Sequence, residues 1–511
     1  MNEKLLSVAL AVFIVPSCLA ATGSHEVESK MFSTRWHNFN NCEIPITNYG
    51  EFGYMYGFWP TGSGEPYIFG AGIWIGAMKN GDAVVSCGYN PFGHGNDWMP
   101  GPPEHNYDHS VDPFSHPEDR IYLSNDPTDL EEWPLRDSVG LPIIFSEQDG
   151  WGEYNDLWEE NHQWEPGTYP LGLWVRQHSL CWKVPSTLED MLFILYQIEN
   201  VSLDTIEEMY VGIAADMDVG WADDDLVGCV IEKGLGYTYT PTQEPGWSSP
   251  PPYYVGVAFV RGPRADDTVY VADGPWNPDY PEASIDTIYP GECLPLTSFT
   301  RCTGPGCINE EEKYLMLAGY NVSNHERDPW QGVRDVVPDD KRMILGCGPF
   351  DLIPGEIDTL VIALMFSNGN TGGYDHLLRQ SDTARTLYES NWIPSEVLEE
   401  HPSGLLLQSP FPMETSPNPF TAQTTIRYGL PDYTRVNLKV YNLLGQEIRL
   451  LVDELQAPGI HTIIWDGRDH LGRKVSSGSY FLRLAIWSVH TDLGVEEAEG
   501  NSATRRVCVV K

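Results

Sequence analysis

The chain has few basic residues. Its 511 residues include 30 Lys and Arg against 73 Asp and Glu, a formal net charge of −43. A surface this poor in positive charge excludes sequence-independent binding of nucleic acid, which needs basic side chains to displace counterions from phosphates. Docking on anionic lipid is excluded for the same reason. An apolar fraction of 41%, with 17 Trp and 26 Tyr, excludes a disordered acidic chain. At ~150 residues per domain, the length predicts two to four folded domains.

Apolar runs long enough to cross a membrane are also missing. The N-terminal run, Leu5–Val15, is shorter than the ~20 residues that a spanning helix needs, and Pro16 interrupts it. A charged start, this apolar run and the small residue Ala20 are typical of a secretory signal peptide over residues 1–20. An uncleaved membrane anchor and a lipid anchor on Cys18 are the alternatives. We expect an exported mature chain without a transmembrane segment, secreted or held at the outer cell surface.

Cysteines and common catalytic signatures are scarce as well. Gly-x-Ser-x-Gly, phosphate-binding loops and Rossmann glycine patterns are absent. Ten cysteines are present, nine of them after residue 20, and in an oxidising compartment we expect most to form disulfides. The Gly/Pro loop Cys302–Cys307 favours a disulfide over a zinc half-site. Because nine is odd, Cys508 is left over, which fits either removal of the C-terminal segment after export or a buried free thiol.

What is present is a pattern of β-strands, and we predict an all-β fold. The large acidic region 21–393, in one domain or two subdomains, contains apolar runs of strand length at 69–77, 190–198, 254–260 and 359–366. The one notable helix is expected near 373–391, because its apolar residues share a face and Pro394 stops it. A Pro-rich linker, 394–413, follows.

The C-terminal hundred residues have a different character. From Thr424, apolar and polar residues alternate between turn signals, which predicts six or seven half-buried antiparallel strands in an Ig-like sandwich. Residues 410–511 hold 11 basic and 11 acidic residues, so residues 1–409 hold 19 and 62 and carry the whole net charge. Such a change in charge indicates a domain boundary.

Several motifs in this segment occur together in one known family. They are Ser416-Pro-Asn-Pro-Phe420, Val440-Tyr-Asn-Leu-Leu-Gly445, Trp465-Asp-Gly467 and Ser476-Ser-Gly-Ser-Tyr-Phe481. Residues 414–511 resemble the FlgD-like Ig domain of flagellar hook-capping proteins, in the version similar to the type IX secretion C-terminal sorting domain. Pieces of region 21–393 resemble secreted bacterial proteins that carry the same terminal domain. A long polar stretch, Ser488–Thr504, departs from the short hairpin usual in the family.

The resemblance implies a role in sorting or attachment. The partners would be the export and sorting machinery, acting through residues 414–511, with removal of that segment and anchoring to surface polysaccharide as further consequences. The alternative is a permanent stalk or interaction domain.

The densest chemical motif is an acidic loop after the predicted strand 210–214. Five carboxylates gather in ten residues, with one glycine and no basic residue among them: Asp216, Asp218, Asp223, Asp224 and Asp225. They would repel one another unless solvated or neutralised, and Ca²⁺ accepts six to eight oxygen ligands from irregular loops. We therefore predict a structural Ca²⁺ site. A solvated acidic loop and catalytic carboxylates are the alternatives, and the spacing excludes an EF-hand.

Two further clusters are candidates for chemistry. Four histidines among acids could bind a transition metal, but nearby prolines favour an exposed acidic loop; they are His94, His105, His109 and His116. Acids and tryptophans alternate between Glu147 and Trp164, a composition that suits a glycan-binding face or a paired-carboxylate hydrolase. Our interpretation is a non-catalytic binding or structural protein. The alternative is a secreted glycan-active hydrolase using acids from 147–160 or 216–225.

Overall fold

The computed structural model describes two segments of the chain, interrupted by short gaps. They are residues 32–390, without 55, 93–95, 107–115, 137–139, 141, 163–168, 273–283, 304–308, 323–324 and 328–334, and residues 413–509, without 417–419, 422, 431–433, 442–446, 457–458, 477 and 489–501. The predicted signal peptide and nearly all of the predicted linker lie outside the described residues.

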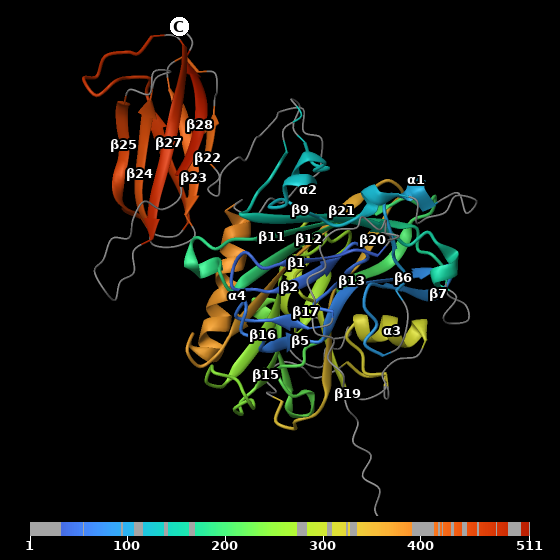
Figure 1. Cartoon of the computed structure of the whole chain (residues 1–511). Helices are drawn as coiled ribbons and strands as arrows, with labels where there is room; N and C mark the ends of the chain where they lie inside the picture. The colour runs from blue at the N-terminus through green and yellow to red at the C-terminus, as the bar shows by residue number, and fades with distance from the viewer. Residues whose placement is uncertain are drawn as a thin grey trace, which may run out of the picture.

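Two large antiparallel sheets form the first segment (Figure 1). The first sheet runs in the order β1 (Thr34–His37), β2 (Ile44–Thr47), β3 (Glu51–Phe52), β6 (Gly70–Lys79), β13 (Ile206–Asp216), β20 (Lys341–Leu352) and β19 (Ser298–Thr303), and β7 (Asp82–Cys87) also pairs with β6. The second sheet runs in the order β14 (Leu226–Val230), β15 (Leu235–Thr240), β16 (Tyr253–Arg261), β21 (Ile357–Ser367), β12 (Met191–Asn200), β11 (Leu173–Cys181), β10 (Gln148–Asn155) and β8 (Met99–Pro100), and β9 (Tyr122–Leu123) pairs with β10.

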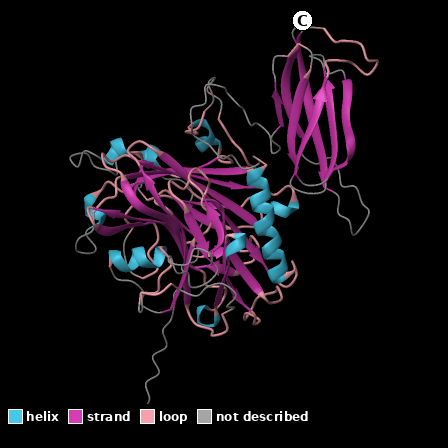
Figure 2. Cartoon of the chain, turned by 180° about the vertical axis from the view of Figure 1, so that it is seen from behind, coloured by secondary structure: helices cyan, strands magenta, loops and turns pink. Residues whose placement is uncertain are grey.

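Short hairpins and helices complete this segment. The hairpins are β4 (Gly57–Phe58) with β5 (Pro66–Ile68), and β17 (Val269–Ala272) with β18 (Ser284–Ile288). The helices are α1 (Pro103–Asn106), α2 (Pro127–Glu131), α3 (Glu310–Leu317) and α4 (Gly373–Glu389), besides 3₁₀ turns η2 (Pro117–Asp119), η3 (Glu159–His162), η4 (Ser186–Leu188), η5 (Ala222–Asp224) and η6 (Ile231–Lys233). Figure 2 shows the helices at the periphery of a unit built mainly of strands.

The main core lies between the two sheets. Ile73 of β6 and Ile213 of β13 pack in one cluster with Ile194 of β12 and Ile362 of β21. The next residue along β21, Ala363, belongs instead to a cluster on the opposite face. Central strands of the second sheet are thus buried on both faces, which explains why they read as continuous apolar runs instead of alternating ones.

The outer faces of the two sheets are covered by helices. Leu377 and Ala384 of α4 are buried in a cluster with residues of β16 and β21. On the first sheet, Leu317 of α3 packs against Trp74 of β6 and Ile344 of β20. The all-β prediction is confirmed, and the helix expected near 373–391 is α4, which ends at Glu389. The short helix α3 was not predicted.

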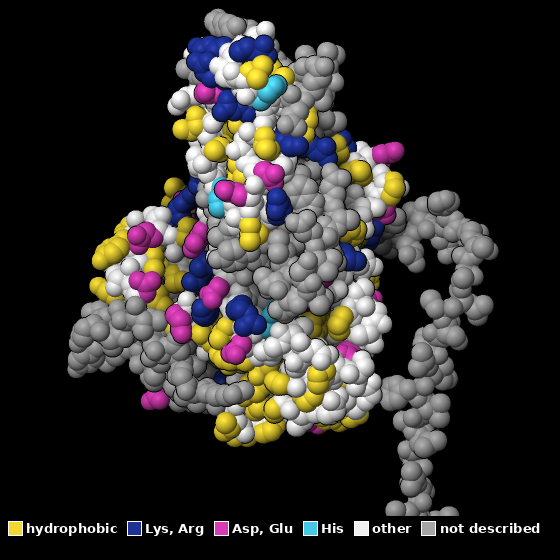
Figure 3. Space-filling model, turned by 90° about the vertical axis from the view of Figure 1, so that its left-hand side faces the viewer, with side chains coloured by type: hydrophobic (Ala, Val, Ile, Leu, Met, Phe, Trp, Pro, Cys, Tyr) yellow, Lys and Arg dark blue, Asp and Glu magenta, His cyan; other side chains and the backbone are white. Residues whose placement is uncertain are grey.

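All four predicted apolar runs are strands, namely β6, β12, β16 and β21. In the C-terminal segment the prediction of six or seven strands is also confirmed. One sheet orders β22 (Met413–Ser416), β23 (Thr424–Leu430) and β26 (Gly459–Trp465), and the other orders β25 (Glu447–Gln456), β24 (Thr434–Tyr441), β27 (Gly478–Ser488) and β28 (Ser502–Val509). Ile426, Leu438 and Leu482 are buried. In Figure 3, Lys and Arg side chains gather at the outer end of this unit.

Several cysteines differ from the expectation that most are paired. Cys42, Cys181 and Cys347 are buried free thiols, and Cys293 is an exposed free thiol. The buried three are packed as small apolar side chains, a role that needs no partner sulfur. The predicted Cys302–Cys307 disulfide involves a residue outside the described ranges. Among the described helices, none is long and apolar enough to cross a membrane.

Candidate metal centre

The acidic cluster lies where a central strand ends. Strand β13 ends at Asp216, which pairs with Gly70 of β6 on one side and with Arg342 of β20 on the other. Residues 217–225 then leave the first sheet, and β14 begins in the second sheet at Leu226. The cluster therefore lies where the chain passes from one sheet to the other.

Asp216 is buried, with only 3% of its surface exposed. Its Oδ2 accepts a hydrogen bond from the Tyr89 hydroxyl at 3.2 Å and forms an ion pair with Arg342 Nε at 3.3 Å. Its Oδ1 has no hydrogen-bond partner among the described residues. Burial raises the pKa of Asp216 to about 6, and the Arg342 guanidinium opposes that rise. One oxygen of this carboxylate is satisfied and the other is not.

Asp218 and Asp340 complete the first group of carboxylates. Because Asp216 pairs with Arg342 in an antiparallel ladder, continuing both chains by two residues brings Asp218 opposite Asp340. One oxygen from each of the three aspartates lies within 4.8 Å of the others. Arg342 Nη2 lies 3.2 Å from Asp340 Oδ2, while Asp340 Oδ1 has no partner in the described part of the chain. Burial, then repulsion by Asp216 and Asp340, raises the pKa of Asp218 to about 7.

A second group of carboxylates lies further along the same loop. Asp225 is fully buried, and its Oδ2 accepts a hydrogen bond from the Val219 backbone N–H at 3.3 Å. Burial, then the charge of Asp218, raises the pKa of Asp225 well above its usual range. Asp224 Oδ2 accepts a hydrogen bond from Thr242 Oγ1 at 2.8 Å. The Oδ1 atoms of Asp224 and Asp225 have no partner within the described ranges.

Glu244 reaches this loop because residue 220 is glycine. Gly220 has a φ of +79°, and a Cβ at this position would lie 2.4 Å from Glu244 Oε2. That oxygen accepts a hydrogen bond from the Trp221 backbone N–H at 3.1 Å. Burial, then the charge of Asp224, raises the pKa of Glu244 to about 7. Only glycine combines the left-handed turn with so close an approach of a carboxylate.

The five aspartates predicted from the sequence do not occupy equivalent positions. Asp216 and Asp218 lie together. Asp224 and Asp225, in the same loop, each have one oxygen without a hydrogen-bond partner among the described residues. Asp223 is exposed, and its Oδ2 accepts a hydrogen bond from Trp221 Nε1 at 3.2 Å.

Sequence reasoning missed Asp340 and Glu244, which come from other parts of the chain. The one available signal for Asp340 was the acidic pair Asp339-Asp340 immediately before the apolar strand β20, which mirrors the acids that immediately follow β13. Glu244 had no comparable signal, because it lies in an irregular loop between β15 and β16. Only the fold brings Asp340 to Asp216 and Glu244 to Gly220.

The donor set suits a hard cation. All the candidate ligand atoms are carboxylate oxygens, which favours Ca²⁺ or Mg²⁺ over transition metals. Asp216, Asp218 and Asp340, once ionised, leave a net charge of −2 after Arg342 is counted. The irregular loop and the number of oxygens fit Ca²⁺ better, because Mg²⁺ demands near-octahedral geometry.

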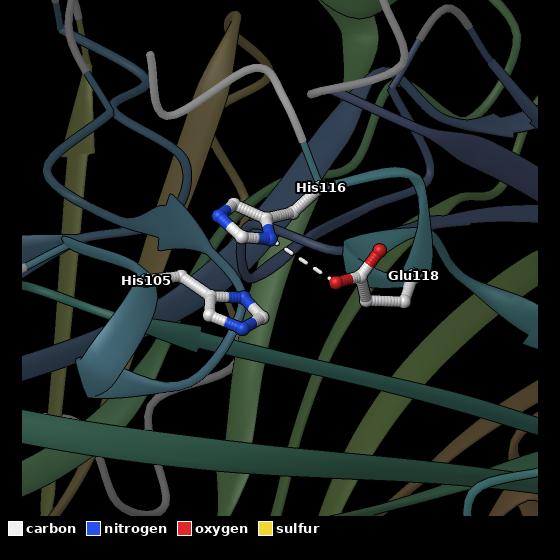
Figure 4. A group of neighbouring side chains, drawn as sticks. All are labelled: His105, His116 and Glu118. Atoms are coloured by element: carbon white, nitrogen blue, oxygen red, sulfur yellow. Dashed lines mark hydrogen bonds and ion pairs between the residues drawn. The ribbon is translucent and has the colours of Figure 1, made fainter. Parts of the chain in front are cut away.

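Two stacked histidines form a separate candidate group (Figure 4). The rings of His105 and His116 lie 3.8 Å apart between centroids, with 9° between their planes. His105 Nδ1 lies 2.9 Å from Asp119 Oδ1, and His116 Nδ1 lies 3.1 Å from Glu118 Oε1. Each imidazole therefore already has a carboxylate partner.

This stacking does not form a ready metal site. The lone pairs of two parallel rings lie in parallel planes, so they do not converge on one ion without a turn of one ring. The other two predicted histidines, His94 and His109, lie outside the described residues. The sequence favoured an exposed acidic loop over a metal site here, and that interpretation stays a prediction.

Three of the acids between residues 147 and 160 are held by hydrogen bonds within the fold. Glu147 Oε2 accepts hydrogen bonds from two backbone N–H groups at 2.7 and 3.1 Å. Asp156 accepts three from backbone N–H groups at the start of β11, at 2.7 to 3.0 Å. Asp149 accepts two more and lies 2.9 Å from His178 Nε2. Trp151 is buried. Carboxylates committed to backbone donors are poorly placed for catalysis.

Comparisons with known proteins do not assign a family. No family model matches the chain, and no curated protein matches it. A polysaccharide lyase structure matches with 7% identity and a TM-score of 0.26, covering 95% of this chain and 47% of its own. Latent PorU from Porphyromonas gingivalis matches with 11% identity and a TM-score of 0.18, covering 76% and 34%. A GalM/aldose epimerase homologue from C. elegans matches with 8% identity and a TM-score of 0.24, covering 66% and 98%.

This chain thus spans about half the length of the polysaccharide lyase and about a third of PorU. All three TM-scores are below 0.5, so these similarities assign neither an activity nor a ligand.

Proposed function

We propose that this chain is a non-catalytic binding protein of the cell exterior, whose large domain is stabilised by Ca²⁺. The observation that carries the proposal is a set of carboxylate oxygens without hydrogen-bond partners among the described residues, on Asp216, Asp224, Asp225 and Asp340. Leaving a buried polar atom unsatisfied costs free energy, and the cost is larger for a charged group. A cation bound between Asp216, Asp218 and Asp340 would satisfy the oxygens of Asp216 and Asp340.

A cation held by Asp216, Asp218 and Asp340 would lie where the chain passes from the first sheet to the second. Asp216 ends β13 and Asp340 precedes β20, both in the first sheet, while Asp225 immediately precedes β14 in the second. The ion would thus tie the ends of two neighbouring strands at the loop that leads to the second sheet, a structural role instead of a catalytic one.

The burial of these acids weighs against the hydrolase alternative. Asp216 and Asp225 are 3% and 0% exposed, so a substrate has no direct access to them. Glu147, Asp149 and Asp156 accept backbone hydrogen bonds, as described above. A glycosidase needs two carboxylates that both face the scissile bond. These five acids are poorly placed to form such a pair.

Calorimetric titration and thermal melting test the Ca²⁺ site. Chelator-treated protein should bind Ca²⁺ and melt at a higher temperature in millimolar Ca²⁺ than in chelator. Asp340→Asn and Asp225→Asn should weaken Ca²⁺ binding. The control variant Glu207→Gln replaces an exposed acid on β13, the strand that ends at Asp216, and should bind Ca²⁺ like wild type. If wild-type protein melts at the same temperature in millimolar Ca²⁺ and in chelator, the proposed Ca²⁺ site is wrong.

For the C-terminal unit we propose sorting or attachment through residues 414–511. Its support is the resemblance of the motifs, the neutral charge and the arrangement of three and four strands in two sheets. The partners would be the export and sorting machinery, and surface polysaccharide is a candidate anchor. The intact mass of the extracellular protein tests this. A product that ends near residue 413 supports sorting with cleavage. A product that retains Lys511 indicates instead that the unit is a permanent stalk or interaction domain.

A further inference from the structure

Four aromatic side chains form a connected row on the surface of the large domain. Trp36 stacks on Phe58 with 6.4 Å between ring centroids and 12° between planes. The Phe58 and Tyr56 rings lie 6.4 Å apart between centroids with 37° between planes, and the Tyr56 and Phe69 rings lie 5.8 Å apart and nearly perpendicular, at 81°. Trp36, Tyr56 and Phe69 are 36%, 43% and 37% exposed, and Phe58 is half-buried. We call these four residues the aromatic row. Most large apolar side chains of this domain are buried, so a run of exposed rings is a departure that indicates a binding surface.

Edge elements of the fold hold the row in place. Trp36 lies on β1, the edge strand of the first sheet. Phe58 belongs to β4, and Phe69 immediately follows β5, its hairpin partner. Tyr56 has a φ of +78°, a left-handed conformation that is costly for an aromatic residue. Strained residues of this kind persist where the surrounding structure fixes them, and they concentrate at ligand sites.

The row ends beside the candidate metal centre. The Phe69 backbone N–H donates to the Asp216 carbonyl at 3.0 Å, and the Gly220 N–H donates to the Pro66 carbonyl at 3.1 Å. Phe69 is therefore tied to the strand that carries the first carboxylate of the centre. A long ligand on the row would have exposed rings along one part and an acidic or cation-bearing loop at its end.

We infer that the aromatic row binds a neutral polysaccharide, which names the ligand class of the binding function proposed above and rests on it. Sugar rings have apolar faces that stack on aromatic rings, and Trp36, Tyr56 and Phe69 each expose part of a ring on this surface. The acidic loop at the end of the row, and the net charge of −43 carried by residues 1–409, disfavour anionic polymers.

Affinity electrophoresis and calorimetry with linear neutral glucans and mannans test this inference, using the full exported chain. Wild-type protein should bind at least one of them. Trp36→Ala and Tyr56→Ala should each bind about three- to tenfold more weakly, because each removes one ring contact. Trp36→Phe should restore most of the affinity. The matched control is Tyr289→Ala, an exposed tyrosine after β18 that should bind like wild type.

The calcium response separates this inference from the proposed function. If the row variants keep the wild-type shift of melting temperature in Ca²⁺ but lose polysaccharide binding, the row is the binding surface. If Ca²⁺ has no effect while polysaccharide binding still depends on Trp36, the metal centre is wrong and the row stands. Binding to no neutral polysaccharide, equal binding by the Trp36→Ala/Tyr56→Ala double variant, or binding only to an extended peptide would each overturn the inference.

Discussion

The strongest test of the metal centre is the pH dependence of stability without calcium. Asp218 has a pKa raised to about 7, far above the ~3.9 of an aspartate in an unfolded chain. A carboxyl group with a raised folded pKa favours folding most fully below its unfolded pKa, and that stability is lost as the pH rises through the folded pKa. Each pH unit between the two values is worth about 1.4 kcal/mol, so the loss from pH 5 to pH 8 is about 2.5 kcal/mol for Asp218 alone.

The expected behaviour follows from this sign. In chelator, the free energy of unfolding should fall as the pH rises from 5 to 8, measured by urea unfolding with fluorescence or circular dichroism. Asp216, with a pKa raised to about 6, should contribute to the lower part of the same window. In saturating Ca²⁺ the fall should disappear, since the ion replaces the protons. At 100 times its dissociation constant, Ca²⁺ should add about 2.7 kcal/mol.

Replacing Asp218 tests whether this residue, and not the acidic residues of the protein in general, causes the pH dependence of stability. Asp218→Asn removes the group with the raised pKa, so the chelated variant should be more stable than wild type at pH 8 and about equal to it at pH 5. Its response to Ca²⁺ should be much smaller. Glu207→Gln, on the strand β13 that ends two residues before Asp218, should behave like wild type in both respects. Equal pH profiles for wild type and Asp218→Asn would refute the reasoning.

Three further predictions test other parts of the structure. Gly220→Ala should destabilise the large domain by about 2 to 3 kcal/mol in urea unfolding, because φ is +79° and a Cβ would collide with Glu244; a cost below ~0.5 kcal/mol would contradict this. Asp156→Ala should cost about 3 kcal/mol by the same assay, because three backbone N–H groups and the Ser86 hydroxyl lose their acceptor, whereas exposed Glu207→Ala should cost little. Cys293 should react quickly with a thiol reagent in the native protein, while the buried thiols described above should react only on unfolding; rapid modification of those thiols would show that they are accessible.

Local patterns in the sequence were sufficient to predict the strands. The runs that became β12, β16 and β21 are apolar at successive positions, and alternation in the C-terminal hundred residues anticipated β23 to β27. The helix α4 followed from its apolar face and from Pro394. The helix α3 was missed because three consecutive glutamates open it and its apolar face is short.

The candidate metal centre could be predicted only in part from the sequence, for a physical reason. Asp216 and Asp218 follow a strand, and their repulsion is visible along the chain itself. Asp340 reaches them only because β20 pairs with β13 in one particular register. Glu244 packs against residue 220 only because that residue is a glycine. Pairing between distant strands is decided by the packing of the whole core, which no local pattern encodes.

The aromatic row, too, could not be predicted from local sequence patterns. Nothing in the spacing of Trp36, Tyr56, Phe58 and Phe69 distinguishes them from the many aromatic residues of the core. By itself the sequence determined the all-β class, the boundary between an acidic and a neutral segment, and the first acids of the candidate cation site. The tertiary structure alone decided which acids are buried together and which rings stay exposed, because burial depends on how the two sheets and their edge hairpins pack.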